Sequence, residues 1–137
     1  MGYFQSSQQL QDVLGGFFEA LINHPEVGPK LKGSKLKLKF AYTDPDLSIS
    51  MDLGQEPVRF LFNDDSVQPE VQLSMKADVA HRFWHGKVNL IAALTRREMV
   101  AKGPIPKILK LLPAIKPAYA LYPEYLKSKG MENLVVK

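Results

Sequence analysis

The sequence predicts an α+β fold in which helices cover one face of a five-stranded, mainly antiparallel sheet. Two patterns carry this prediction. Residues 10–22 hold an apolar stripe at helical spacing, and several later segments alternate apolar and polar residues with a period of two. Such alternation gives each strand one apolar face, which is typical of an antiparallel sheet covered on one side. At 137 residues, we expect a single domain over residues 1–137.

The first helix is expected between Ser6 and Pro25. Its apolar residues recur at helical spacing and are Leu10, Val13, Leu14, Phe17, Phe18, Leu21 and Ile22. Ser6 can begin a capping box, and Pro25 ends the helix. The pair Gly15-Gly16 costs roughly 1 kcal/mol per glycine relative to alanine, so we expect close packing against it.

Three strands are expected next. The segment 25–34 is rich in Pro and Gly and is expected to be a loop or a single turn. Residues 35–42 and 47–53 alternate apolar and polar side chains around a turn at 43–46, so they are expected to pair as a hairpin. Residues 58–62 form the third strand, and a polar loop follows.

The segment from Glu70 to Gly103 is the most apolar part of the chain. It predicts a strand over 70–76, then a short aromatic helix capped by Asp78 and stopped by Gly86. A nearly uncharged stretch over 88–94 leads to a last strand at 98–102. So much apolar surface in a small protein indicates a cavity for an apolar ligand.

The tail begins with an amphipathic basic segment from Ile105 to Lys116. This segment suits docking on an anionic membrane, a lid over a pocket, or plain packing on the core. Pro113, Pro117 and Pro123 are expected to divide the tail into short pieces. The tyrosines at 119, 122 and 125 are expected to form a packing edge with their hydroxyls in water.

The order of these pieces resembles the sterol carrier protein 2 (SCP2) lipid-transfer family over about residues 34–117. The resemblance is carried by Phe40 to Asp44, Pro69 to Met75, Asp78 to Gly86, and a last strand closing on Lys102-Gly103. Thr95 to Glu98 departs from the Gly and Lys with which the family often enters this strand. The resemblance implies a hydrophobic tunnel between sheet and helices that accepts fatty acids, fatty acyl-CoA, sterols or phospholipids without catalysis.

The resemblance also leads to candidate site residues. The expected tunnel walls are Phe83, Trp84, Leu90, Ile91, Leu94, Met99, Ile105, Ile108, Leu109 and Leu112. Each of these positions suits an ordinary core residue equally well. Arg96, Arg97 or Lys102 is expected near an anionic headgroup.

Charge is unevenly distributed along the chain. From Arg96 onward nine basic and three acidic residues give +6, so the first 95 residues carry −2 of the total +4. A basic half favours anionic partners such as phospholipid headgroups, although lysines that only keep an apolar protein soluble explain it equally well. The lysines of residues 30–39 lack the Arg and aromatic neighbours of nucleic-acid sites, so we expect no nucleic-acid partner.

No pattern predicts catalysis, a cofactor or a metal site. The chain has no cysteine, and it contains neither a nucleophile elbow nor a phosphate-binding glycine loop. His81 and His85 lie one helical turn apart, but Arg82 stands where a zincin needs Glu, and no third ligand is evident. We therefore expect two surface histidines near a helix end, and His24 as a helix-end residue.

Three classes of function stay open: a freestanding lipid carrier, an auxiliary or regulatory subunit of a lipid-modifying enzyme, and a structural or regulatory homodimer. An enzyme partner would be expected at residues 119–125. The first residues lack the basic and apolar regions of a signal peptide, and no apolar run approaches the ~20 residues that span a bilayer. We therefore expect a cytoplasmic protein.

Overall fold

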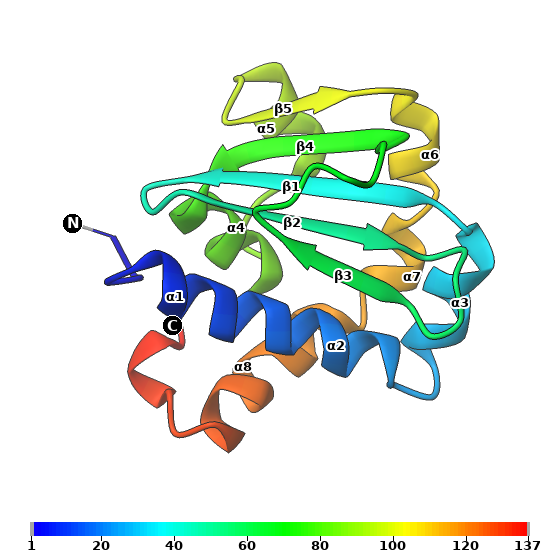
Figure 1. The fold of residues 1–137 in the computed structure, drawn as a ribbon. Helices are drawn as coiled ribbons and strands as arrows, with labels where there is room; N and C mark the ends of the chain where they lie inside the picture. Colours follow the sequence, from blue (N-terminus) through cyan, green and yellow to red (C-terminus); the bar gives the residue numbers. More distant parts are fainter. Residues whose placement is uncertain (1, 137) are drawn as a thin grey trace.

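The computed structural model describes residues 2–136 and contains a five-stranded sheet with helices on one face (Figure 1). The strand order is β3-β2-β1-β4-β5. The strands are β1 (Lys37–Thr43), β2 (Leu47–Asp52), β3 (Arg59–Phe62), β4 (Val71–Lys76) and β5 (Met99–Lys102). The β1–β4 pair is parallel and the other three pairs are antiparallel, which confirms the predicted α+β class.

The helices fall into two groups along the chain, before β1 and after β4. They are α1 (Ser7–Leu10), α2 (Gly16–Ile22), α3 (Val27–Ser34), α4 (Ala77–Trp84), α5 (Leu90–Thr95), α6 (Ile105–Leu109), α7 (Leu112–Ile115) and α8 (Ala118–Ser128). A π-helical turn at Gln11–Gly15 joins α1 to α2, and a 3₁₀ turn at Glu132–Leu134 follows α8. Among residues 2–136, no helix combines the length and the apolar character needed to cross a bilayer.

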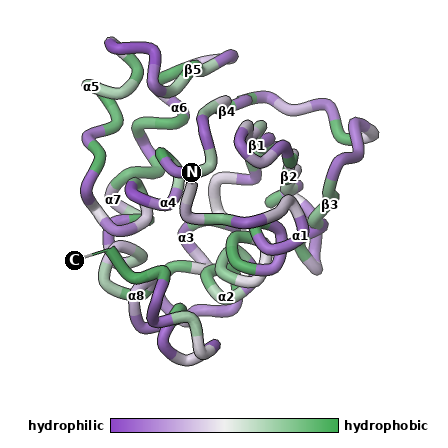
Figure 2. The backbone as a smooth tube through the Cα atoms, turned by 90° about the vertical axis from the view of Figure 1, so that its left-hand side faces the viewer, coloured by the Kyte–Doolittle hydropathy of each residue, from purple (hydrophilic) through white to green (hydrophobic). Residues whose placement is uncertain are grey.

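The alternation of apolar and polar residues along each strand determines which face of the sheet meets the helices. In register, Phe40 of β1 lies between Ile49 of β2 and Leu73 of β4, and all three are apolar. The next register positions, Lys39 with Ser50 and Gln72, belong to the opposite face. In Figure 2 the colour of the backbone changes repeatedly between hydrophobic and hydrophilic along the chain. The core therefore lies between one sheet face and the helices.

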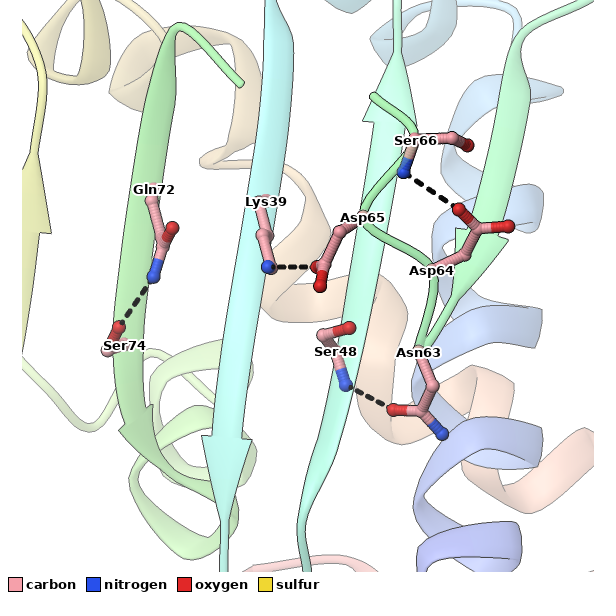
Figure 3. Close-up of polar contacts among 8 residues, drawn as sticks. All are labelled: Lys39, Ser48, Asn63, Asp64, Asp65, Ser66, Gln72 and Ser74. Atoms are coloured by element: carbon pink, nitrogen blue, oxygen red, sulfur yellow. Dashed lines mark hydrogen bonds and ion pairs between the residues drawn. The ribbon is translucent and has the colours of Figure 1, made fainter. Parts of the chain in front are cut away.

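The opposite face is partly covered by the connection from β3 to β4, because this connection must cross β2 and β1. Figure 3 shows two contacts that hold it: Lys39 Nζ lies 2.6 Å from Asp65 Oδ1, and the Ser48 amide donates to Asn63 Oδ1 at 2.9 Å. Val67 in the same connection is buried. The predicted polar loop is thus a cover for the second sheet face.

The predicted first helix is confirmed as the continuous run α1, π turn and α2. The glycine pair permits close packing, as expected. A Cβ atom on Gly15 would lie 2.9 Å from Cε1 of Phe62, and one on Gly16 would collide with the hydroxyl of Tyr125. Two different elements, β3 and α8, therefore approach this helix at the glycines.

The expectation of a loop or turn over residues 25–34 is wrong, because Val27–Ser34 forms helix α3. The amides of Glu26 and Val27 both donate to Nδ1 of His24 at 3.1 Å, which caps the helix and confirms His24 as a helix-end residue. Pro29 lies in the first turn of α3. Amide N–H groups in a first turn have no intrahelical acceptor, so a proline there removes no helical hydrogen bond.

The predicted cap of α4 is also wrong, because this helix begins at Ala77 and its N-cap residue is Lys76. The Asp78 carboxylate instead accepts a hydrogen bond from the Tyr3 amide at 2.9 Å, which ties the start of the chain to α4. Gly86 ends the helix as predicted, with φ of 74°. Such a conformation costs glycine little.

The tail differs from its prediction at one proline. Pro113 lies in the first turn of α7 and Pro117 precedes α8, as expected for helix starts, but Pro123 lies inside α8. Tyr122 and Leu126 of α8 are completely buried, so tertiary packing stabilises a helix that proline alone would interrupt. The prediction that the tyrosine hydroxyls lie in water is wrong for Tyr122.

Candidate functional site

A small apolar cavity of about 80 Å³ lies between the inner face of the sheet and the helices. Strands β1, β2, β4 and β5 supply one wall, and helices from α2 to α7 supply the other. Of the side chains that line it, only Tyr42 and Trp84 carry a nitrogen or oxygen atom. The cavity can therefore bind an apolar molecule, but its walls offer no ionised group for catalysis.

Six of the ten predicted wall residues line this cavity: Phe83, Trp84, Leu90, Met99, Ile108 and Leu112. Leu94 and Leu109 are half-buried and pack against the core outside the cavity lining. Ile91 and Ile105 are 61% and 41% exposed, so they face solvent. On the short helix α5, Leu90 faces inward, and its chain neighbour Ile91 is rotated away by about 100°.

The prediction missed the wall that the sheet provides, except for Met99 of β5. This wall includes Leu38, Phe40, Met51, Val71, Leu73 and Met75. The period-two alternation already placed these residues on the apolar sheet face. A cavity between sheet and helices must be lined by both layers, so the same pattern could have identified them.

A groove with basic side chains adjoins the cavity at the ends of β1 and β4. Its basic residues are Lys76, Arg82 and Arg97, and Glu98 is also part of its lining. Tyr42 and Met75 line both the groove and the cavity, whereas Ala41, Ser74 and Val100 of the groove belong to the opposite sheet face, so the two spaces border each other across the ends of β1 and β4.

The turn at residues 95–98 positions Arg97 with φ of 60°, a left-handed conformation that most side chains avoid. This is the turn at which the sequence departs from the family's Gly. Of the three predicted headgroup residues, Arg97 lines the groove and the other two do not. Arg96 lies 3.9 Å from Glu98, and Lys102 is exposed on β5.

His81 is completely buried, so the prediction that it lies on the helix surface is wrong. Its Nε2 lies 2.6 Å from the Leu134 carbonyl oxygen, and its Nδ1 lies 2.8 Å from the Tyr122 hydroxyl. A carbonyl only accepts, so Nε2 carries the proton and Nδ1 accepts from Tyr122. Burial lowers the pKa of His81 to about 4, which keeps the ring neutral at pH 7.

His85 continues the network and is only half-buried. Its Nε2 accepts from the Val136 amide at 3.1 Å, so its Nδ1 carries the proton and donates to the His81 carbonyl at 2.8 Å. Both ring nitrogens of each histidine are therefore used inside the protein. Residues 2–136 contain no group of three or more His, Cys, Asp or Glu side chains placed to hold a metal ion. The pair anchors the C-terminal segment to α4 and α8.

Solved structures with this fold share little sequence with the chain. Sterol Carrier Protein 2 from Yarrowia lipolytica (apo form) is 15% identical, with a TM-score of 0.57 over 88% of this chain and 89% of that one. The sterol carrier protein domain 2 of Helicoverpa armigera is 15% identical, with a TM-score of 0.63 over 80% and 89%. A protein described as "UbiJ-SCP2 Ubiquinone synthesis protein" is 15% identical, with a TM-score of 0.58 over 82% and 89%.

These likenesses show the fold. The search of curated proteins found no match for the sequence. The family comparison goes further, because the sequence model of the SCP-2 sterol transfer family matches residues 18–116, which is most of the chain and includes every strand. The chain therefore belongs to the SCP-2 sterol transfer family.

Proposed function

We propose that the protein binds one lipid in the cavity between sheet and helices and carries it without chemical change. The observation that supports this most directly is a cavity lined almost wholly by carbon. Each methylene group that leaves water for such a site contributes about 0.8 kcal/mol, so a long acyl chain or a sterol gains ample free energy. The family's description as sterol transfer proteins supports the same function.

The cavity must widen to hold such a ligand. Its volume is about 80 Å³, whereas pockets for ligands of moderate size are roughly 300–1,000 Å³. We place the opening at α6 and α7, which have five and four residues. Leu111, Leu112 and Ile115 line the cavity from this segment and are only half-buried. Moving such residues exposes less additional apolar surface than moving α2 or α4.

The basic groove is the proposed headgroup site. Lys76, Arg82 and Arg97 give it a positive charge that Glu98 offsets only in part. An anionic headgroup would be attracted to it, with the acyl chain in the adjoining cavity. The groove lies at the end of β4, whereas α6 contacts the start of β4 through the Lys107–Glu70 pair, so the chain would extend from the groove toward the opening at α6 and α7. This favours a fatty acid, a fatty acyl-CoA or a phospholipid over an uncharged sterol. Arg96 and Lys102 lie outside the groove lining, so the headgroup proposal rests on Arg97 together with Lys76 and Arg82.

Transient contact with an anionic membrane surface is part of the proposed transfer. Ile105, at the start of α6, is 41% exposed, and Lys107 and Lys110 of the same segment are exposed too. An exposed apolar side chain beside lysines suits the surface of a bilayer that contains anionic lipid. This contact would bring the proposed opening to the lipid.

Titration with palmitate, read by tryptophan fluorescence, tests lipid binding. Trp84 is the single tryptophan of the chain and lines the cavity, so its emission reports directly on occupancy. We expect a saturable change at one palmitate per protein. Dodecylmaltoside at the same concentration controls for nonspecific detergent-like effects. An emission spectrum that stays unchanged up to the solubility limit of palmitate would contradict the proposal.

A second candidate is an auxiliary subunit of a lipid-modifying enzyme. The fold neighbour described as a ubiquinone synthesis protein favours it, because that description names the synthesis of a lipid rather than its transfer. The partner surface would lie at the half-buried Tyr119 and Tyr125 of α8. The two functions differ in a transfer assay: a carrier moves a fluorescent fatty acid between vesicles by itself, and an auxiliary subunit retains the ligand.

A further inference from the structure

The hydroxyl oxygen of Tyr42 is buried but makes no hydrogen bond within the described part of the protein. Tyr42 is the next-to-last residue of β1, it lines the cavity, and it is 4% exposed. Tyr122, by contrast, is also buried, but its hydroxyl donates a hydrogen bond to His81. Burial raises the pKa of Tyr42 well above its usual value, so the hydroxyl keeps its proton and can donate.

The ring of Tyr42 stacks with a second aromatic ring. The ring of Tyr42 lies parallel to that of Phe40, with 6.2 Å between ring centroids and 4° between planes. The side chains around the cavity are otherwise apolar, apart from the indole of Trp84. Since buried polar atoms in native proteins are nearly always hydrogen-bonded, a buried donor without a partner at the wall of a binding cavity indicates a partner on the ligand.

We propose that the Tyr42 hydroxyl donates a hydrogen bond to a neutral carbonyl oxygen of the bound lipid. This inference rests on the proposed lipid-binding function and names the class of ligand. The oxygen is neutral because no cationic side chain lines the cavity, and an ionised carboxylate would lose its hydration there without an opposite charge. The cations lie in the adjoining groove. A neutral carbonyl between an apolar chain and a charged headgroup is the ester or thioester of an acyl lipid, which is the ligand class that we propose.

Two probes of equal chain length isolate this hydrogen bond: 2-tetradecanone, which has a carbonyl, and tetradecane, which has none. Binding of each to the full chain is followed by Trp84 emission. In Tyr42→Phe, which keeps the ring and removes the hydroxyl, we expect the ketone to bind about tenfold more weakly, the loss typical of one hydrogen bond. The affinity for tetradecane is expected to stay within twofold of the natural protein.

Ser50→Ala is the matched control. The Ser50 hydroxyl is also buried without a partner, but it lies on the opposite sheet face, outside the cavity lining. We expect this variant to bind both probes like the natural protein. In urea unfolding without ligand, neither variant is expected to lose stability, because neither hydroxyl makes a hydrogen bond in the protein. A clear loss of stability in Tyr42→Phe would show that its hydroxyl is already satisfied and would overturn the inference.

The remaining outcomes separate this inference from the proposed function. If Tyr42→Phe binds the ketone as tightly as the natural protein, the inference fails and lipid binding stands. Equal weakening for both probes shows a packing effect and also overturns the inference. If the natural protein binds neither probe and no palmitate, the proposed function itself fails, and the role of Tyr42 fails with it.

Discussion

At the scale of residues, His81 gives the protein a pH-dependent stability. Its pKa is about 4 in the folded protein, against about 6.5 in an unfolded chain. Between these values the unfolded chain binds a proton that the folded protein does not, so the free energy of unfolding falls as the pH drops. We expect a loss of about 3 kcal/mol from pH 7 to pH 4. Urea unfolding at a series of pH values measures it.

His85 adds to this loss of stability at low pH, because burial also lowers its pKa. In His81→Gln, stability at pH 7 is expected to fall, since the Tyr122 and Leu134 partners lose part of their hydrogen bonding. The pH dependence between 7 and 4 is expected to be much shallower than in the natural chain. A variant with an equally steep dependence would show that another group controls it.

The same residues show where sequence reasoning reaches its limit. The spacing of His81 and His85 was read on α4 alone, where both lie near a helix end. Their burial depends on α8 and the C-terminal segment, which lie about 40 to 50 positions away in the chain. Tyr122 was misplaced for the same reason. Residue spacing describes one element at a time, whereas the hydrogen bonds of His81 join α4, α8 and the C-terminal 3₁₀ turn.

At the scale of elements, the glycines of two helices give opposite predictions for substitution by alanine. Gly16→Ala is expected to destabilise the protein by about 1–3 kcal/mol, because the new methyl group would collide with Tyr125. Gly33 lies in α3, and a Cβ there would meet nothing within 4 Å. Gly33→Ala is therefore expected to stabilise by about 0.4–1 kcal/mol. Urea unfolding measures both, and equal effects would contradict the close packing at Gly16.

The ion pair between Lys107 and Glu70 links α6 to the start of β4 at 3.0 Å. If α6 and α7 open for the ligand, Glu70→Gln should make opening easier and speed palmitate association by about twofold to fivefold, as expected for a surface pair. Stopped-flow Trp84 emission measures this rate. Asp65→Asn breaks a similar pair, with Lys39, on the other sheet face. It serves as the control, and equal acceleration in both variants would place the opening elsewhere.

Elements differed in how well their sequences predicted them. All five strands were predicted to within about two residues. The residues of β1, β2 and β4 alternate between apolar and polar, a pattern that one buried face explains. Helix α3 was missed, since Gly28 and Pro29 disfavour a helix when judged by propensity alone. The cap from His24 and the first-turn position of Pro29 remove that penalty, and neither is evident without the folded geometry.

At the scale of the whole molecule, an apolar cavity beside a basic groove predicts preference for anionic lipids. Arg82→Gln together with Arg97→Gln is expected to weaken palmitate binding about threefold to tenfold and to leave methyl palmitate unchanged, because only the carboxylate is charged. Arg96→Gln is the matched control, as this side chain is exposed and lies outside the groove lining. Fluorescence titration at low and high salt measures the affinities. An equal loss in the control would assign the effect to net charge.

The family and its layered fold could be predicted from the sequence, since they depend on the order of whole elements. The cavity could be predicted only in part, because six helix and strand residues were found while the remaining sheet wall was overlooked. The unpartnered hydroxyl of Tyr42 lies beyond such prediction. Alternation places Tyr42 on the inner face, but whether another group meets its oxygen depends on the packing of every neighbouring element.

Native mass spectrometry of the purified protein tests lipid binding most directly. We expect the measured mass to exceed that of the chain by the mass of one lipid, or a one-to-one complex to form after palmitate is added. Organic extraction then identifies the class of the bound lipid. A protein that keeps the mass of the bare chain, both as purified and after addition of palmitate and palmitoyl-CoA, would contradict the account and favour a protein partner instead.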